Sequence, residues 1–302
     1  MTAPRHQADP SRVKDLLCAW IVRQSTNEEV DWLRAKQAEI ESGAPAWKFF
    51  TAFSAVPRYL GKEDLEITES DVADARALRA GWTPSGWSID QAGRTVLVLS
   101  YPHGDPDAYV ETLDQVFSTA DVRESVALYQ MLPLFPHPTR FPDRCAEGLR
   151  TNMKSVFNAV AHDNPYPSEY LDDAAWNQMV LKALFIDSPL HKIRGLDDRA
   201  NSDLARMLVD YAHERWAADR PVSPELWRPV GPFAGETFLE ELERVLQSDD
   251  EAEREAAALA LADAGSDRAG DLLAAQPDLK QRVMSGELTW KSFSRNRIPV
   301  PA

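Results

Sequence analysis

Residues 162–216 read HDNPYPSEYLDDAAWNQMVLKALFIDSPLHKIRGLDDRANSDLARMLVDYAHERW, and this stretch decides the fold class. A helix is predicted from Ala174 to Ile186, with Asp172 or Asp173 capping its start. Apolar side chains surround it almost completely, which is typical of a buried helix. A second helix is predicted from Arg199 or Asn201 to Ala218. Short connections place consecutive helices side by side, so these two helices are expected to pack together.

Outside this stretch, helix start signals recur along the chain. Capping boxes are predicted where Thr26 is followed by Glu29 and where Asp121 is followed by Glu124. No segment alternates with period two for long. Residues 96–99 could form a buried strand, but the helices on both sides favour a helix over 88–101. The predicted fold class is therefore all-α, either an irregular α-solenoid of stacked HEAT- or armadillo-like helix pairs or a helical bundle.

Prolines and periodicity predict three local features. Pro57 should break or bend the aromatic helix over residues 49–56. Residues 144–162 are predicted to form one continuous helix. Residues 164–167, Asn-Pro-Tyr-Pro, are predicted to form a rigid, non-helical bend, because each proline disfavours helical backbone in the residue before it.

The expected organisation is one helical domain with two short extensions. Residues 1–10 are expected to form a flexible arm, residues 11–290 a single all-helical domain, and residues 291–302 a tail. The C-terminal part of this domain, residues 236–285, is acidic and helical, and a solvated face is the simplest explanation of its charge.

Charge and hydropathy exclude several classes of partner. The 302 residues include 48 acidic against 33 basic side chains, a net charge of −15, which argues against binding nucleic acid or anionic lipid. No apolar run approaches the ~20 residues of a spanning helix, so no membrane insertion is expected. The first twelve residues lack the apolar core of a secretory signal. Cys18 and Cys145 cannot form a disulfide framework, and a cytoplasmic location is expected.

Candidate functional residues follow the two central helices. Asn177, Gln178 and Lys182 are the polar members of the buried helix, and they must face either a narrow solvent strip or a polar pocket. On the second helix, charges of alternating sign lead to His213, and they form either a surface salt-bridge ladder or part of a covered site.

We expect the site residues to converge on one cavity. His162 and His213 are the catalytic candidates, because histidine exchanges protons near neutral pH. The other candidates would bind a ligand through rings, amides and cations: Asn164, Tyr166, Trp176, Asn177, Lys182, Arg199, Asn201 and Arg215. His213 lacks the second histidine of a zinc-protease motif, and no metal site or cofactor is expected.

At these residues the chain resembles the EboA family of bacterial metabolite-traffic proteins. The resemblance covers roughly residues 45–233, and it rests on long segments: FFTAFSAVPRYLGK (49–62), GWTPSGWSIDQAGR (81–94), GLRTNMKSVFNAV (148–160), HDNPYPSEYLDDAAWNQMVLKALF (162–185) and GLDDRANSDLARMLVDYAHERWAADR (195–220). It implies a place beside enzymes and membrane proteins that make or export specialised metabolites. It carries over no catalytic residues.

Two classes of function follow. The first is a protein of specialised-metabolite biosynthesis or traffic that binds a small polar metabolite, or another protein of the same biosynthetic cluster, in a helical cavity. The alternative is an enzyme of isomerase, lyase or hydrolase type acting on a small cyclitol-, sugar- or prenyl-derived metabolite. The absence of a catalytic motif favours the first, and the density of His, Asn, Trp and Arg favours the second.

Overall fold

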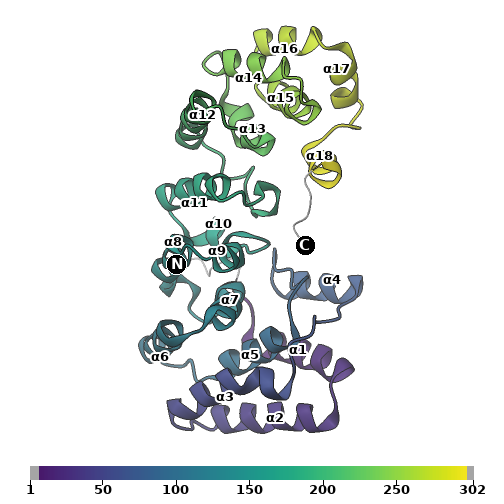
Figure 1. Cartoon of the computed structure of the whole chain (residues 1–302). Coiled ribbons are helices and arrows are strands. Elements are labelled where there is room, and N and C mark those ends of the chain that lie inside the picture. Colours follow the sequence, from purple (N-terminus) through teal and green to yellow (C-terminus); the bar gives the residue numbers. More distant parts are fainter. Residues whose placement is uncertain (1–6, 298–302) are drawn as a thin grey trace. The chain divides into compact units, whose positions relative to one another are not determined.

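The computed structural model describes residues 7–297, and this range contains helices and no strand (Figure 1). The all-α prediction is confirmed, whereas the stacked-pair repeat remains a prediction. The chain forms two compact units, residues 1–171 and 172–302, which are described separately. The expectation of a single domain over residues 11–290 also remains a prediction. No helix in the described range combines the length and apolar character needed to cross a lipid bilayer.

The first unit contains ten α-helices within the described range. They are α1 (Pro10–Gln24), α2 (Asn27–Glu41), α3 (Ala46–Tyr59), α4 (Glu69–Leu78), α5 (Ile89–Ser100), α6 (Pro106–Thr119), α7 (Val122–Gln130), α8 (Pro142–Arg150), α9 (Lys154–Ala161) and α10 (Tyr166–Tyr170). The predicted capping boxes at Thr26 and Asp121 start α2 and α7, and the helix predicted over 88–101 is α5.

Helix α5 is the centre of the first unit, and it packs against α1, α2, α3 and α7 (Figure 1). All its residues except Gln91 are buried. Two of them are charged: Arg94 forms an ion pair with Asp90 one turn earlier, and Asp90 also accepts a hydrogen bond from Ser88. The charges are tolerated in the core because each has a partner within hydrogen-bond distance.

Pro57 does not break α3, so of the two outcomes predicted from sequence, a break or a bend, the break is wrong. The helix continues to Tyr59. A proline inside a helix leaves the carbonyl four residues earlier without its usual donor, here that of Phe53. The buried guanidinium of Arg94 supplies the replacement, because its Nε donates to the Phe53 carbonyl at 3.2 Å. The donor comes from α5, so the pattern of α3 alone could not predict it.

The single helix predicted over residues 144–162 is two helices, α8 and α9, separated at residues 151–153. Thr151 is extended, and its hydroxyl accepts a hydrogen bond from the Met153 amide at 3.2 Å. The break lets α8 fold back on α9, with Gly148 so close that an added Cβ would lie 2.8 Å from a Val160 methyl. Packing between the two helices therefore overrides the continuous periodicity.

The Asn-Pro-Tyr-Pro segment is only partly a bend. Asp163 has a left-handed backbone conformation, but Tyr166 and Pro167 are the first residues of α10. A proline in the first turn of a helix loses no hydrogen bond, since the first amides have no partner within the helix. The prediction that all four residues are non-helical is therefore wrong for the last two.

The second unit contains eight α-helices among its described residues. They are α11 (Asp173–Phe185), α12 (Ser202–Ala217), α13 (Trp227–Val230), α14 (Leu239–Leu246), α15 (Glu251–Asp263), α16 (Asp267–Ala274), α17 (Pro277–Met284) and α18 (Trp290–Arg297). Helix α15 is the centre, and it packs against α13, α14, α16, α17 and α18 (Figure 1). Its buried Glu255 is paired with Arg282 of α17 at 2.6 Å.

The ends of the chain correct the predicted arm and tail where they are described. Asp9 caps α1, and Pro10 is its first residue, so this part of the 1–10 arm is ordered into a helix start. Residues up to Arg297 of the predicted 291–302 tail belong to α18, which buries Phe293 and hydrogen-bonds Asp263 through Trp290. Residues 1–6 and 298–302 lie outside the described residues.

Candidate functional site

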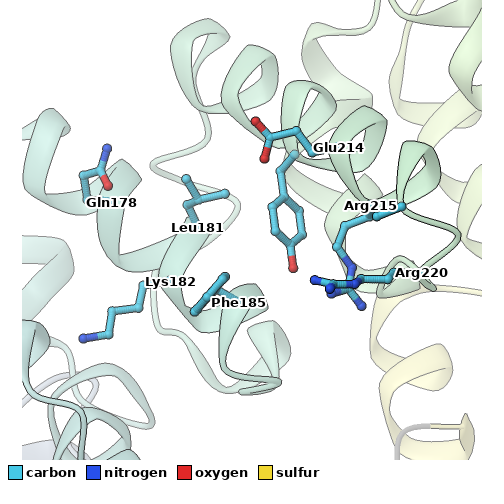
Figure 2. Close-up of a pocket in the computed structure, with 9 residues that line it drawn as sticks. Gln178, Leu181, Lys182, Phe185, Glu214, Arg215 and Arg220 are labelled. Carbon is cyan, nitrogen blue, oxygen red and sulfur yellow. The ribbon is translucent and has the colours of Figure 1, made fainter.

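A groove between α11 and the C-terminal end of α12 is the candidate site in the second unit (Figure 2). It has a cavity volume of about 550 Å³, within the usual range for small-molecule sites. Apolar, cationic and polar side chains line it: Gln178, Leu181, Lys182, Phe185, Tyr211, Glu214, Arg215, Ala218 and Arg220.

The two helices are held together beside the groove by a pair of amides. Asn177 of α11 and Asn201 at the start of α12 exchange two hydrogen bonds, at 2.9 and 3.2 Å. The Asn201 side chain also caps α12 by accepting a hydrogen bond from the Leu204 amide at 2.9 Å. Asn177 is buried and Asn201 is half-buried, and their two reciprocal hydrogen bonds hold the start of α11 against the start of α12 beside the groove.

The sequence of α11 explains why one face of it is left for the groove. Asp172 caps the helix through the Ala175 amide, and Trp176, Met179, Val180 and Ala183 are buried. Residues 178, 181, 182 and 185 lie at three- and four-residue spacings and share the remaining face. Phe185 on this face is 74% exposed, an unusual position for a large aromatic side chain.

The groove carries more positive than negative side chains. Lys182, Arg215 and Arg220 are cationic and Glu214 is anionic, so three positive charges against one leave a local excess of two. Figure 2 shows the side chains of Arg215 and Arg220 pointing into the same part of the groove, whereas Lys182 extends away from them. Burial lowers the pKa of Lys182 from its ordinary value. In a chain with a net charge of −15, this local excess is a distinct feature.

The turn that ends α12 brings both arginines into the groove lining. The Arg220 amide donates to the Arg215 carbonyl at 2.9 Å, and the Asp219 amide donates to the Trp216 carbonyl at 3.1 Å. This pair of bonds is a Schellman motif, with Asp219 at the left-handed position (φ 53°) that glycine usually occupies. The Arg215 Nε also donates to the Pro221 carbonyl at 3.0 Å, which fixes its guanidinium in the turn.

The structure places the predicted ligand-binding residues in different surroundings. Lys182 and Arg215 line the groove, and Asn177 and Asn201 form the amide pair beside it. Arg199 is paired with Asp173 and lies 4.9 Å above the ring of Trp176. The Trp176 Nε1 group is buried without a hydrogen-bond partner among the described residues.

The three predicted residues of the first unit belong to the surroundings of α9 and α10. The Asn164 amide donates to the carbonyls of Tyr129 and Ala159, and its carbonyl accepts from the Tyr166 amide. The Tyr166 hydroxyl donates to the Pro138 carbonyl, and the ring is buried. His162 is the half-buried residue that ends α9. The convergence of all predicted residues on one cavity stays a prediction.

The other catalytic candidate, His213, lies on α12 but does not line the groove. Its Nε2 atom is 3.0 Å from a carboxylate oxygen of Glu241, and about half of the side chain is exposed. Among the described residues, no histidine or cysteine lines the groove. Its one carboxylate, Glu214, is exposed.

Sequence reasoning missed Phe185, Tyr211 and Arg220 as parts of the site. Phe185 and Tyr211 fit the apolar pattern of ordinary helix residues, and the structure places them on the facing sides of α11 and α12. Arg220 lies beyond the predicted end of the second helix. Only the Schellman turn brings it into the groove lining, and an aspartate at the turn position is a weaker sequence signal than a glycine.

A second hollow of about 780 Å³ lies in the first unit beside α1 and α4. Its charged lining is mostly acidic, from Asp64, Glu66 and Glu69, and its one cation, Arg23, is paired with Asp71. Within residues 7–297, no group of three or more His, Cys, Asp or Glu side chains is arranged to hold a metal ion.

Comparison with known proteins gives one match. A family model described as "Metabolite traffic protein EboA" matches residues 13–231, which include α11, α12 and the whole of the groove lining. No curated protein and no solved structure matches the chain.

Proposed function

The chain belongs to the EboA family of metabolite traffic proteins, and we propose that it binds a small metabolite in the groove between α11 and α12. The observation that carries the proposal is the combination of an exposed aromatic ring, two guanidiniums without acidic partners and a cavity of about 550 Å³. Small-molecule sites typically combine apolar walls with a few fixed polar groups.

The arrangement supports binding and release more than catalysis. A general acid or base must reach the reacting group in a defined geometry, usually in a site that excludes water. The only carboxylate of the groove is exposed, and the nearest histidine on α12 is turned to Glu241. We therefore favour a carrier, or a protein that delivers a metabolite to other members of its biosynthetic cluster, over an enzyme of isomerase, lyase or hydrolase type.

The proposal is tested by filling the groove. Ala218 lines it and Ala217 does not, although both are exposed at the end of α12. Ala218→Trp should occupy part of the cavity, and Ala217→Trp adds the same side chain one residue away. We expect the wild type and Ala217→Trp to retain a metabolite when purified from cells that contain the intact pathway, detected by native mass spectrometry, and Ala218→Trp to lose it.

Two results would contradict this function. Wild-type protein that retains no small molecule would argue against a carrier. If Ala218→Trp retains as much of the metabolite as the wild type, the binding site is not this groove. The same material separates a carrier from an enzyme. A carrier releases the captured molecule unchanged after incubation with pathway extract, whereas an enzyme yields a product of different mass.

A further inference from the structure

We infer that the ligand of this groove is an amphipathic anion: an apolar or aromatic body that carries a carboxylate or a phosphate, with the acid group held between Arg215 and Arg220. The inference rests on the proposed function, because it names the class of metabolite that the same groove would bind. Three features of the groove support it. The two guanidiniums have no acidic partners, a turn of the backbone carries both of them, and apolar side chains line the rest of the groove.

The two guanidiniums lack the partners that the neighbouring arginines have. Arg199, Arg206 and Arg228 each form an ion pair with an aspartate. Arg220 makes no side-chain hydrogen bond or ion pair to the described residues, and Arg215 uses only its Nε, on the Pro221 carbonyl. Acids outnumber bases 48 to 33 in this chain, so carboxylates were available to neutralise the pair. The fork geometry of guanidinium suits carboxylate and phosphate oxygens.

The turn after α12 fixes the backbone that carries both arginines and the guanidinium of Arg215. The two hydrogen bonds of the Schellman motif fix the backbone from Arg215 to Arg220, and the bond to Pro221 orients the Arg215 guanidinium. Two like charges directed into one part of the groove repel each other when no anion lies between them. A bound oxyanion would remove this repulsion and would accept hydrogen bonds from both guanidiniums, and the Arg215 side chain is already held in place before it binds.

The wall opposite the arginines suits an apolar body. Leu181 and Phe185 of α11 line the groove together with Tyr211 of α12 and Ala218, the residue that follows α12. Covering the exposed ring of Phe185 would remove apolar surface from water, which is favourable by roughly 25 cal/mol per Å². A small inorganic anion would leave this wall exposed, and a wholly apolar ligand would leave the guanidiniums without an anion.

The test uses three probes that share one ring system and differ in the attached group. They are 2-naphthoate, 2-naphthyl phosphate and the neutral 2-naphthamide, titrated calorimetrically into the full-length protein at pH 7. We expect at least one anion to bind about tenfold or more tightly than the amide. The tighter of the two anions identifies whether the natural acid group is a carboxylate or a phosphate.

Matched variants assign the effect to the arginine pair. Arg220→Gln removes a charge from the groove, and Arg206→Gln removes one from the exposed Arg206–Asp203 pair of α12 outside it. Arg220→Gln should weaken anion binding about tenfold and leave amide binding unchanged, whereas Arg206→Gln should change neither.

Three results would overturn the inference: neither anion binds, the amide binds as tightly as both anions, or Arg220→Gln behaves like Arg206→Gln. The proposed function fails separately. Capture of a neutral metabolite that Ala218→Trp abolishes would leave the groove as a metabolite site and refute only the anionic class.

Discussion

Asp219 occupies a backbone conformation that few side chains tolerate, with φ 53°. Asp219→Gly should keep the turn and the binding of the tighter naphthyl anion, because glycine adopts this conformation without strain. Asp219→Val should lower the free energy of unfolding by about 1–2 kcal/mol and weaken anion binding, because a β-branched residue resists positive φ. Urea denaturation and calorimetric titration measure the two effects. Wild-type affinity in a destabilised Asp219→Val protein would mean that the turn does not position Arg220.

The ion pair between Arg23 and Asp71 predicts a pH dependence of stability. The Arg23 guanidinium, at 2.7 Å, holds the pKa of the Asp71 carboxyl well below its usual range, with help from hydrogen bonds of Thr68. A depressed pKa in the folded state contributes stability above the unfolded value, about 3.9, and the contribution is lost as pH falls through the folded value.

Removing the guanidinium should therefore matter most near neutral pH. Arg23→Gln should lower the free energy of unfolding by about 1–2 kcal/mol at pH 7. The difference from wild type should shrink as pH falls below about 4, where the carboxyl without its partner becomes protonated. Denaturation curves at pH 7, 5 and 3 test this. A difference that is constant across the three would show that Arg23 acts through packing and not through charge.

At the scale of elements, replacing glycine by alanine should have opposite effects on stability at two positions of the second unit. A Cβ on Gly231 would lie 2.8 Å from the backbone of Ala260 in α15, which cannot move aside, whereas one on Gly270 in α16 meets nothing within 4 Å. Gly231→Ala should destabilise by about 1–3 kcal/mol. Gly270→Ala should stabilise by about 0.5–1 kcal/mol, because alanine favours the helix. Thermal unfolding of the two variants compares them, and equal shifts would contradict the close contact with α15.

Local sequence signals predicted the helices well and their interruptions poorly. The capping boxes at Thr26 and Asp121 are confirmed because a cap is decided within four residues. Pro57 was predicted to break or bend α3, but α3 continues past it, and the donor that replaces its missing amide comes from Arg94, 41 residues beyond Phe53. The division between α8 and α9 likewise depends on tertiary packing around Gly148. The candidate groove follows the same rule: Lys182 and Arg215 belong to the predicted helices, whereas Arg220 lies beyond them and reaches the groove only because of the turn.

At the scale of the whole molecule, the net charge of −15 predicts selectivity between kinds of anion. A single small anion needs only the local positive excess of the groove, whereas a polyanion would also be repelled by the negative net charge of the rest of the protein. The protein should therefore show no measurable binding to duplex DNA at moderate salt while it binds a naphthyl anion. Fluorescence anisotropy with a labelled duplex tests this. Strong binding that falls steeply with added salt would reveal an extended basic surface and contradict this prediction.

Photoaffinity labelling with an azide-bearing 2-naphthoate tests most directly whether the α11–α12 groove is the binding site. Adducts mapped by peptide mass spectrometry should fall within residues 178–185 and 211–220, and unlabelled 2-naphthoate should compete with them. Ala218→Trp should reduce the labelling and Ala217→Trp should not. Adducts concentrated at the second hollow, around Arg23 and residues 64–69, or labelling unchanged in Ala218→Trp, would contradict the assignment of the groove.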